Sequence, residues 1–165
     1  MRVIGGEFRS RRLKTLSGVA LRPTPDRLRE SLFSVLAPRI GGCVFLDAYA
    51  GCGAVGIEAL SRGAARAVFI EKHKPAARLI HENLRSLGAE SRALVLCGPA
   101  LKHLGRVEAD IVFLDPPYAL ELEYKQVLRL LAERPPGLAI AQHSARLDLE
   151  EAYGALRRVR ELRQG

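Results

Sequence analysis

The sequence predicts an α/β fold built on a mainly parallel sheet, and two observations support this. Short apolar runs alternate with helix-period patterns between residues 43 and 143. The runs CVFLD, AVFIE and ALVLC are apolar almost throughout, as in strands that helices cover on both faces. Repeated β-α-β units favour a doubly wound, Rossmann-like sheet with right-handed crossovers. A length of 165 residues fits one domain of this kind.

The first 25 residues are predicted to form a basic extension. RVI and EFRSRRLKT flank Gly5-Gly6, a dipeptide suited to a tight hairpin turn, and Pro23 and Pro25 then break the chain. The net charge of the chain is +8, and this segment carries six basic side chains against one acid. Such clustering indicates a polyanionic partner, with a solubilising surface as the alternative. The expected division is a basic N-terminal hairpin at 1–25 and one main domain at 26–165.

The remaining elements follow from periodicity and from breaker residues. The first helix is expected to be capped by Thr24 or Asp26 and ended by Pro38 and Gly41-Gly42. After it, the sequence predicts strand 43–47, helix 54–63, strand 67–71, helix 75–87, strand 93–97, a short helix at 100–105, strand 110–115, helix 121–134 and strand 138–143.

Three of the predicted strands end in an acid, at Asp47, Glu71 and Asp115. Ligands of doubly wound sheets bind outside the carboxyl ends of the strands, so these acids mark the expected site. Gly51, Gly53 and Gly56 match the G-x-G-x-x-G pattern of dinucleotide sites, which by itself is a weak signal.

Asp47 argues for a different ligand, because a carboxylate beside this loop would repel a pyrophosphate. S-adenosylmethionine carries no phosphate, and its protonated amino group can pair with a carboxylate. Glu71 can accept hydrogen bonds from ribose hydroxyls. The predicted cofactor is therefore S-adenosylmethionine.

The tetrapeptide Asp115-Pro116-Pro117-Tyr118 is the most specific feature of the sequence. An exocyclic base amine is a poor nucleophile, because its lone pair is delocalised into the ring. The Asp115 carboxylate and the Pro116 carbonyl can each accept one of its N–H hydrogen bonds, and the Tyr118 ring can stack on the base. These residue types predict methyl transfer to a base amine, with catalysis by positioning and electrostatics.

Carried by these residues, the sequence resembles the RsmD-type 16S ribosomal RNA (guanine-N2)-methyltransferases over nearly its whole length. The resemblance rests on RVIGGEFRSRRL, RPTPDRLRESLF at 22–33, DAYAGCG, IE at 70–71 and DPPY. It implies a class I S-adenosylmethionine-dependent methyltransferase domain at 26–165. The expected cofactor residues are Asp47, Ala48, Tyr49, Gly51, Gly53, Glu71, Lys72 and Pro99. The expected guanine-binding and catalytic residues are Asp115, Pro116, Pro117 and Tyr118. The expected RNA-binding residues are Arg2, Arg9, Arg11, Arg12, Lys14, Arg22 and Arg27.

The resemblance has two departures. Pro99 stands where the family has Asn or Asp near the adenine, which leaves adenine recognition to backbone groups or apolar packing. The family also usually continues beyond Gly165 into a final strand.

Other functions stay open at this stage. A DNA adenine-N6 methyltransferase could use the same tetrapeptide, and a protein glutamine amide is a further acceptor. A non-catalytic RNA-binding assembly factor and a dinucleotide oxidoreductase are the remaining alternatives. The spacing of Cys and His predicts no metal site, and no apolar run is long enough for a membrane span. We expect a cytoplasmic monomer that acts on ribosomal RNA within a small-subunit particle.

Overall fold

The computed structural model describes residues 1–18, 23–117 and 119–164, and it contains a five-stranded parallel sheet. The strands are β1 (Val44–Asp47), β2 (Arg66–Glu71), β3 (Ala93–Cys97), β4 (Ile111–Leu114) and β5 (Leu138–Ala141). Their order across the sheet is β3-β2-β1-β4-β5, and every neighbouring pair is parallel. The chain therefore turns back between β1 and β4, which is the switch point where doubly wound sheets bind ligands.

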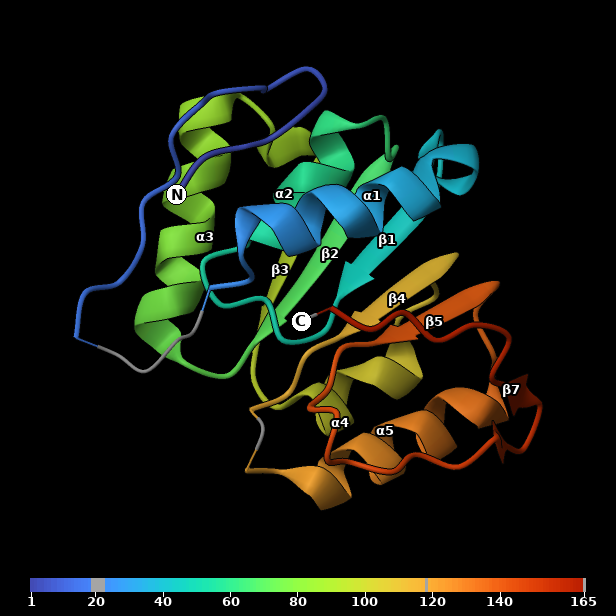
Figure 1. Cartoon of the computed structure of the whole chain (residues 1–165). Coiled ribbons are helices and arrows are strands. Elements are labelled where there is room, and N and C mark those ends of the chain that lie inside the picture. Colours follow the sequence, from blue (N-terminus) through green and yellow to red (C-terminus); the bar gives the residue numbers. More distant parts are fainter. Residues whose placement is uncertain (19–22, 118, 165) are drawn as a thin grey trace.

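Helices cover both faces of the sheet (Figure 1). One face carries α1 (Asp26–Ile40), α2 (Ala54–Ser61) and α3 (Lys74–Leu87), and the other carries α4 (Ala100–His103) and α5 (Glu121–Glu133). Side chains of β1 alternate between the two cores: Phe45 packs toward α1, whereas Leu46 packs against the α5 side. This alternation explains why the strands are apolar without a polar face. Within the described ranges, no helix is both long and apolar enough to cross a membrane.

The N-terminal arm, which we define as Met1–Lys14, differs from the predicted hairpin. Its two ends pair through one antiparallel bridge, Arg2 with Arg12, and no regular strand forms in it. The predicted tight turn at Gly5-Gly6 is wrong, because the connecting loop is wider and lies against α2. A Cβ atom added to Gly6 would come within 1.9 Å of the Ser61 carbonyl oxygen. Gly6 is thus needed for close approach to the helix.

Smaller expectations about α1 are also wrong. Pro25 occupies the position before the helix and no side chain caps it, so neither Thr24 nor Asp26 has the predicted role. Asp26 instead binds Arg29 one turn later. Pro38 lies inside the helix, which continues to Ile40.

Four short elements were not predicted as such. A 3-10 turn, η1 (Glu90–Arg92), precedes β3, and the predicted helix at 100–105 is divided into α4 and a second 3-10 turn, η2 (Leu104–Arg106). Near the C-terminus, β6 (Ala152–Tyr153) and β7 (Leu156–Arg157) form a two-stranded antiparallel pair. Tyr153 of this pair is buried in the core beside α5.

Candidate functional site

Three acids meet at the carboxyl edge of the sheet, as the sequence predicts. Asp47 is in register with Phe69 of β2 and with Phe113 of β4. Glu71 and Asp115 therefore each lie two residues beyond the partners of Asp47, on the strands to either side. Parallel strands bring their carboxyl ends to one edge, so the three side chains surround the switch point between β1 and β4.

Asp47 is almost completely buried, at 1% exposure. Its Oδ2 atom accepts a hydrogen bond of 3.1 Å from the Gly56 amide, in the first turn of α2. Its Oδ1 atom meets no donor in hydrogen-bonding geometry among the described residues. One carboxylate oxygen thus stabilises the start of the helix, and the other keeps unused acceptor capacity.

Burial raises the pKa of Asp47 from 3.8 to about 7. The Gly56 amide lowers this pKa, the negative charges of Asp115 and Glu71 raise it, and the Tyr49 amide lowers it. A buried carboxylate of this kind is costly when ionised without a cation. A positively charged group placed beside Oδ1 would remove that cost.

Glu71 shapes the loop that follows β1. Its Oε2 atom accepts a hydrogen bond of 2.7 Å from the Gly51 amide, and its Oε1 atom accepts one of 2.8 Å from the His73 amide. A carboxylate has about four acceptor positions, so each oxygen keeps capacity for a ligand hydroxyl. The side chain is buried at 7% exposure and is fixed in place by these two bonds.

The three glycines of the G-x-G-x-x-G pattern are suited to their positions for different structural reasons. Gly51 and Gly53 have φ angles of +56° and +86°, in the left-handed region that favours glycine. A Cβ on Gly51 would meet open space, whereas one on Gly56 would lie 2.3 Å from the Phe69 ring. Gly51 therefore leaves room beside the backbone, and Gly56 permits α2 to pack closely on β2.

The tetrapeptide after β4 is described except for its last residue. Asp115 is partly buried and Pro116 is buried, while Pro117 is exposed. The Pro116 carbonyl lies 3.2 Å from the Tyr124 hydroxyl, which lies closer, at 2.6 Å, to the Gln142 carbonyl. A hydroxyl carries one hydrogen, so the Pro116 carbonyl retains acceptor capacity. The predicted stacking residue Tyr118 lies outside the described residues.

The other expected cofactor residues occupy different surroundings. Ala48 is buried, and its amide donates to the Phe113 carbonyl of β4 at 3.0 Å. The Tyr49 hydroxyl donates to Glu123 of α5 at 2.7 Å, which ties the loop after β1 to the helix after the tetrapeptide. Burial, followed by this contact, raises the pKa of Tyr49. Lys72 and Pro99 are both exposed, and Pro99 directly precedes α4.

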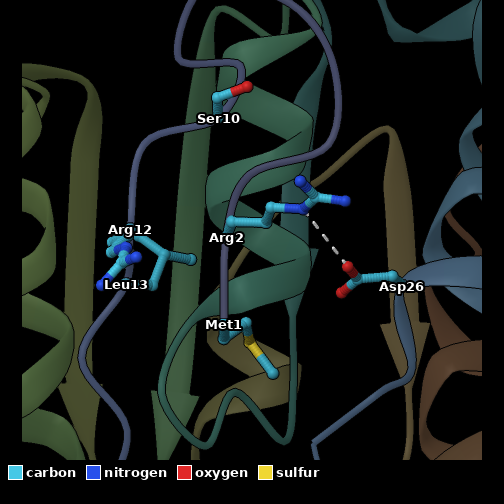
Figure 2. A pocket seen from close by; sticks show the side chains of 6 residues that line it. All are labelled: Met1, Arg2, Ser10, Arg12, Leu13 and Asp26. Atoms are coloured by element: carbon cyan, nitrogen blue, oxygen red, sulfur yellow. Dashed lines mark ion pairs between the residues drawn. The ribbon is translucent and has the colours of Figure 1, made fainter.

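The basic residues of the N-terminal arm are exposed, but several already have partners. Arg2 forms an ion pair of 3.6 Å with Asp26, across an open hollow of about 680 Å³ that Ser10 and Arg12 also line (Figure 2). Lys14 pairs with Glu82 at 2.9 Å. The remaining expected RNA-binding residues of the described chain, all exposed, are Arg9, Arg11 and Arg27, and Arg22 lies outside the described residues.

Three buried polar residues that anchor the arm were missed by sequence reasoning. Arg29 is fully buried, and it donates to the Arg2 carbonyl at 2.9 Å and to Asp26 at 2.6 Å. Glu58 accepts the Ile4 and Gly5 amides at 3.0 and 2.9 Å, and Asn83 binds Lys14. A polar residue on an otherwise apolar helix face could have indicated such a buried anchor, since Glu58 lies within the apolar pattern of α2.

Together these features suit a ligand that carries a positive charge. A buried carboxylate oxygen without a donor suits an ammonium group, and two further acids surround it with negative potential. Open space beside Gly51 admits a ligand close to the backbone. S-adenosylmethionine has an ammonium group and a sulfonium centre, so these residues fit it, whereas a pyrophosphate would face three acids.

Known proteins resemble this chain over most of its length. The model of a family described as Conserved hypothetical protein 95 matches residues 1–165. The Bacillus subtilis protein YlbH is 36% identical over 94% of this chain and 89% of its own length. The Haemophilus influenzae Ribosomal RNA small subunit methyltransferase D is 40% identical over 81% of this chain and 71% of its own. The solved structure of a hypothetical protein from Thermus thermophilus has a TM-score of 0.75 and 35% identity, covering 92% of this chain and 90% of its own.

Proposed function

Since the chain belongs to the Conserved hypothetical protein 95 family, we propose that it methylates the exocyclic N2 amine of a guanine in 16S ribosomal RNA. The proposed methyl donor is S-adenosylmethionine. The chain has the class I methyltransferase fold, and its named relatives are methyltransferases that act on small-subunit ribosomal RNA. The observation that carries the proposal is the meeting of Asp47, Glu71 and Asp115 at one edge of the sheet.

In this proposal the loop after β1 and the acid at the end of β2 hold the cofactor. Asp47 Oδ1 pairs with the ammonium group, Glu71 accepts ribose hydroxyls, and Gly51 gives the ligand room beside the backbone. When bound, the cofactor supplies a sulfonium methyl group whose leaving group is a neutral thioether. The protein therefore needs no acid to protonate the leaving group.

The tetrapeptide after β4 holds and orients the guanine. The Asp115 carboxylate and the Pro116 carbonyl accept the two amine hydrogens, which orients the nitrogen lone pair toward the methyl group. With the cofactor bound, the transferred methyl group would come from its sulfonium, and Asp115 would take up the proton that the methylated nitrogen must lose or pass it to water. Tyr118, in our proposal, stacks on the base, which must leave its helix to enter the site.

The direct test uses radiolabelled S-adenosylmethionine and small ribosomal subunits that lack base methylation. After the reaction the RNA is digested and the labelled nucleoside is identified. We expect label in N2-methylguanosine, and we expect Asp115→Asn to abolish it while cofactor binding persists. Label in N6-methyladenine of added DNA, or in protein, would overturn the proposed acceptor.

A matched control comes from the same strand. Asp110 precedes β4 and Asp115 follows it, so the two acids stand at opposite edges of the sheet. Asp110 is exposed and accepts the Val44 amide at 2.7 Å. Asp110→Asn should leave methyl transfer intact. Absence of both cofactor binding and methyl transfer would favour an RNA-binding assembly factor, and tight NAD binding in place of S-adenosylmethionine would favour an oxidoreductase.

A further inference from the structure

Asn83 joins the N-terminal arm to the loop after β1. It is the only asparagine of the chain, it lies in α3, and it is 1% exposed. Its Oδ1 atom accepts the Lys14 amide at 2.8 Å. Its Nδ2 atom donates to the Lys14 carbonyl and to the Cys52 carbonyl, both at 3.1 Å. One buried side chain therefore holds the backbone of two segments that lie outside the regular strands and helices.

These bonds use the full donor capacity of the side chain. A carboxamide has two N–H hydrogens, and each has its own carbonyl here. The acceptor and one donor face the same residue, Lys14, so the amide can bind it only in one orientation. Removing the side chain would leave three buried or part-buried backbone groups without this partner. The position therefore fixes the arm and the loop relative to each other.

The two linked segments are those that would bind the two substrates. Cys52 stands between Gly51 and Gly53, and its sulfur also lies 3.7 Å from the sulfur of Met1 at the start of the arm. On the arm, the Arg11 guanidinium donates to the Ser86 carbonyl at 2.7 Å, and Lys14 pairs with Glu82. A phosphate that binds Lys14 therefore binds the residue whose backbone Asn83 holds.

We propose that Asn83 is a positioning residue that couples RNA binding on the arm to cofactor binding in the Gly51–Gly53 loop. The proposal rests on the function proposed above. RNA that orders the arm orders the Cys52 carbonyl through Asn83, so the cofactor then meets a loop already fixed. Because coupling between two ligands is reciprocal, the bound cofactor must raise RNA affinity by the same factor.

The test measures a coupling factor. The dissociation constant of S-adenosylhomocysteine is measured alone and with saturating small ribosomal subunits lacking base methylation, and the subunit affinity is measured with and without S-adenosylhomocysteine. We expect each ligand to tighten the other by about 5- to 20-fold in the wild type. In Asn83→Ala we expect this factor to fall below about two, with both ligands still bound. A factor that Asn83→Ala leaves unchanged would overturn the proposal.

The matched control is Glu82→Gln, one residue away on the same helix. This change removes the exposed Lys14 ion pair but leaves the Asn83 bonds to both backbones, so the coupling factor should persist. A measurement on the wild type covers the case in which Asn83→Ala does not fold. Subunit binding should slow hydrogen exchange at the Gly53 amide, and S-adenosylhomocysteine should slow it at the Lys14 amide. Absence of both effects would overturn the coupling, whereas absence of any subunit binding would instead contradict the proposed function.

Discussion

Replacing Asp47 with asparagine should remove a loss of stability that the wild type undergoes as the pH rises, and it should weaken cofactor binding. Asp47 is buried, with a pKa raised from 3.8 to about 7. Between about pH 4 and pH 7 the native state holds a proton that the unfolded state has released. The free energy of unfolding contributed by this group therefore falls as the pH rises through that window.

The size of the effect follows from the two pKa values. At about 1.4 kcal/mol per pKa unit, the wild type should lose roughly 2–3 kcal/mol of stability between pH 5 and pH 8 through Asp47. The asparagine side chain of the variant can still accept the Gly56 amide hydrogen bond, but it does not ionise. Comparing the two proteins at both pH values cancels the constant cost of the new amide group.

Urea unfolding at pH 5 and pH 8, without ligand, checks this prediction. The stability of Asp47→Asn relative to the wild type should rise by roughly 2–3 kcal/mol from pH 5 to pH 8. Asp110→Asn is the matched control, because it removes an exposed carboxylate that also accepts a backbone amide. An equal difference at both pH values would refute the argument that burial holds a proton on Asp47.

The same variant tests the proposed role of the side chain. An amide cannot neutralise an ammonium group, so Asp47→Asn should weaken S-adenosylhomocysteine binding by about 10- to 100-fold at pH 8, the effect of losing a charged hydrogen bond. In the wild type, affinity should fall as the pH drops below about 7, because Asp47 then takes up a proton. Isothermal titration measures both effects, and unchanged affinity would place the ammonium group elsewhere.

Two further substitutions test how the N-terminal arm is held. Gly6→Ala places a methyl group 1.9 Å from the Ser61 carbonyl oxygen, so it should displace the arm and lower RNA affinity at least several-fold. Gly41→Ala is the control, because a methyl group there meets open space at a φ of −60°, and RNA affinity should not change. A filter-binding assay measures the RNA affinity of both variants. Glu58→Gln removes the buried charge beside Arg29 and should cost roughly 3–5 kcal/mol in urea unfolding, so a loss within about 0.5 kcal/mol, the size of a surface change, would contradict the network.

Several elements were predictable because their causes are local. The run ALVLC predicts strand β3 with its observed bounds, and Gly88 follows α3 in the left-handed conformation that favours glycine. Other boundaries shift by one or two residues, as at β5, which ends at Ala141 rather than at residue 143. The chirality of β-α-β connections converts these local patterns into a parallel sheet, so three acids at strand ends imply one site.

The N-terminal arm was less predictable, because its conformation depends on distant partners. Gly5-Gly6 has the local signature of a hairpin turn, yet the backbone there is held by Glu58 and lies against Ser61. Local propensity is a weak influence when a buried carboxylate offers charge-assisted hydrogen bonds to the same amides. Ser10, with a φ of +68°, likewise adopts the left-handed conformation, which the local sequence does not predict.

By itself, the sequence determined the layers and the meeting of three acids at one end of the sheet, because the hydrophobic period, the breaker residues and the strand-end residues act over a few positions. Only the tertiary structure decided that Asp47 is buried, with one oxygen on the Gly56 amide and the other without a hydrogen-bond donor among the described residues. It also decided that Arg29 and Asn83 are buried. Burial of polar groups is favourable only when partners are present, and those of Asn83 lie 69 and 31 residues away along the chain.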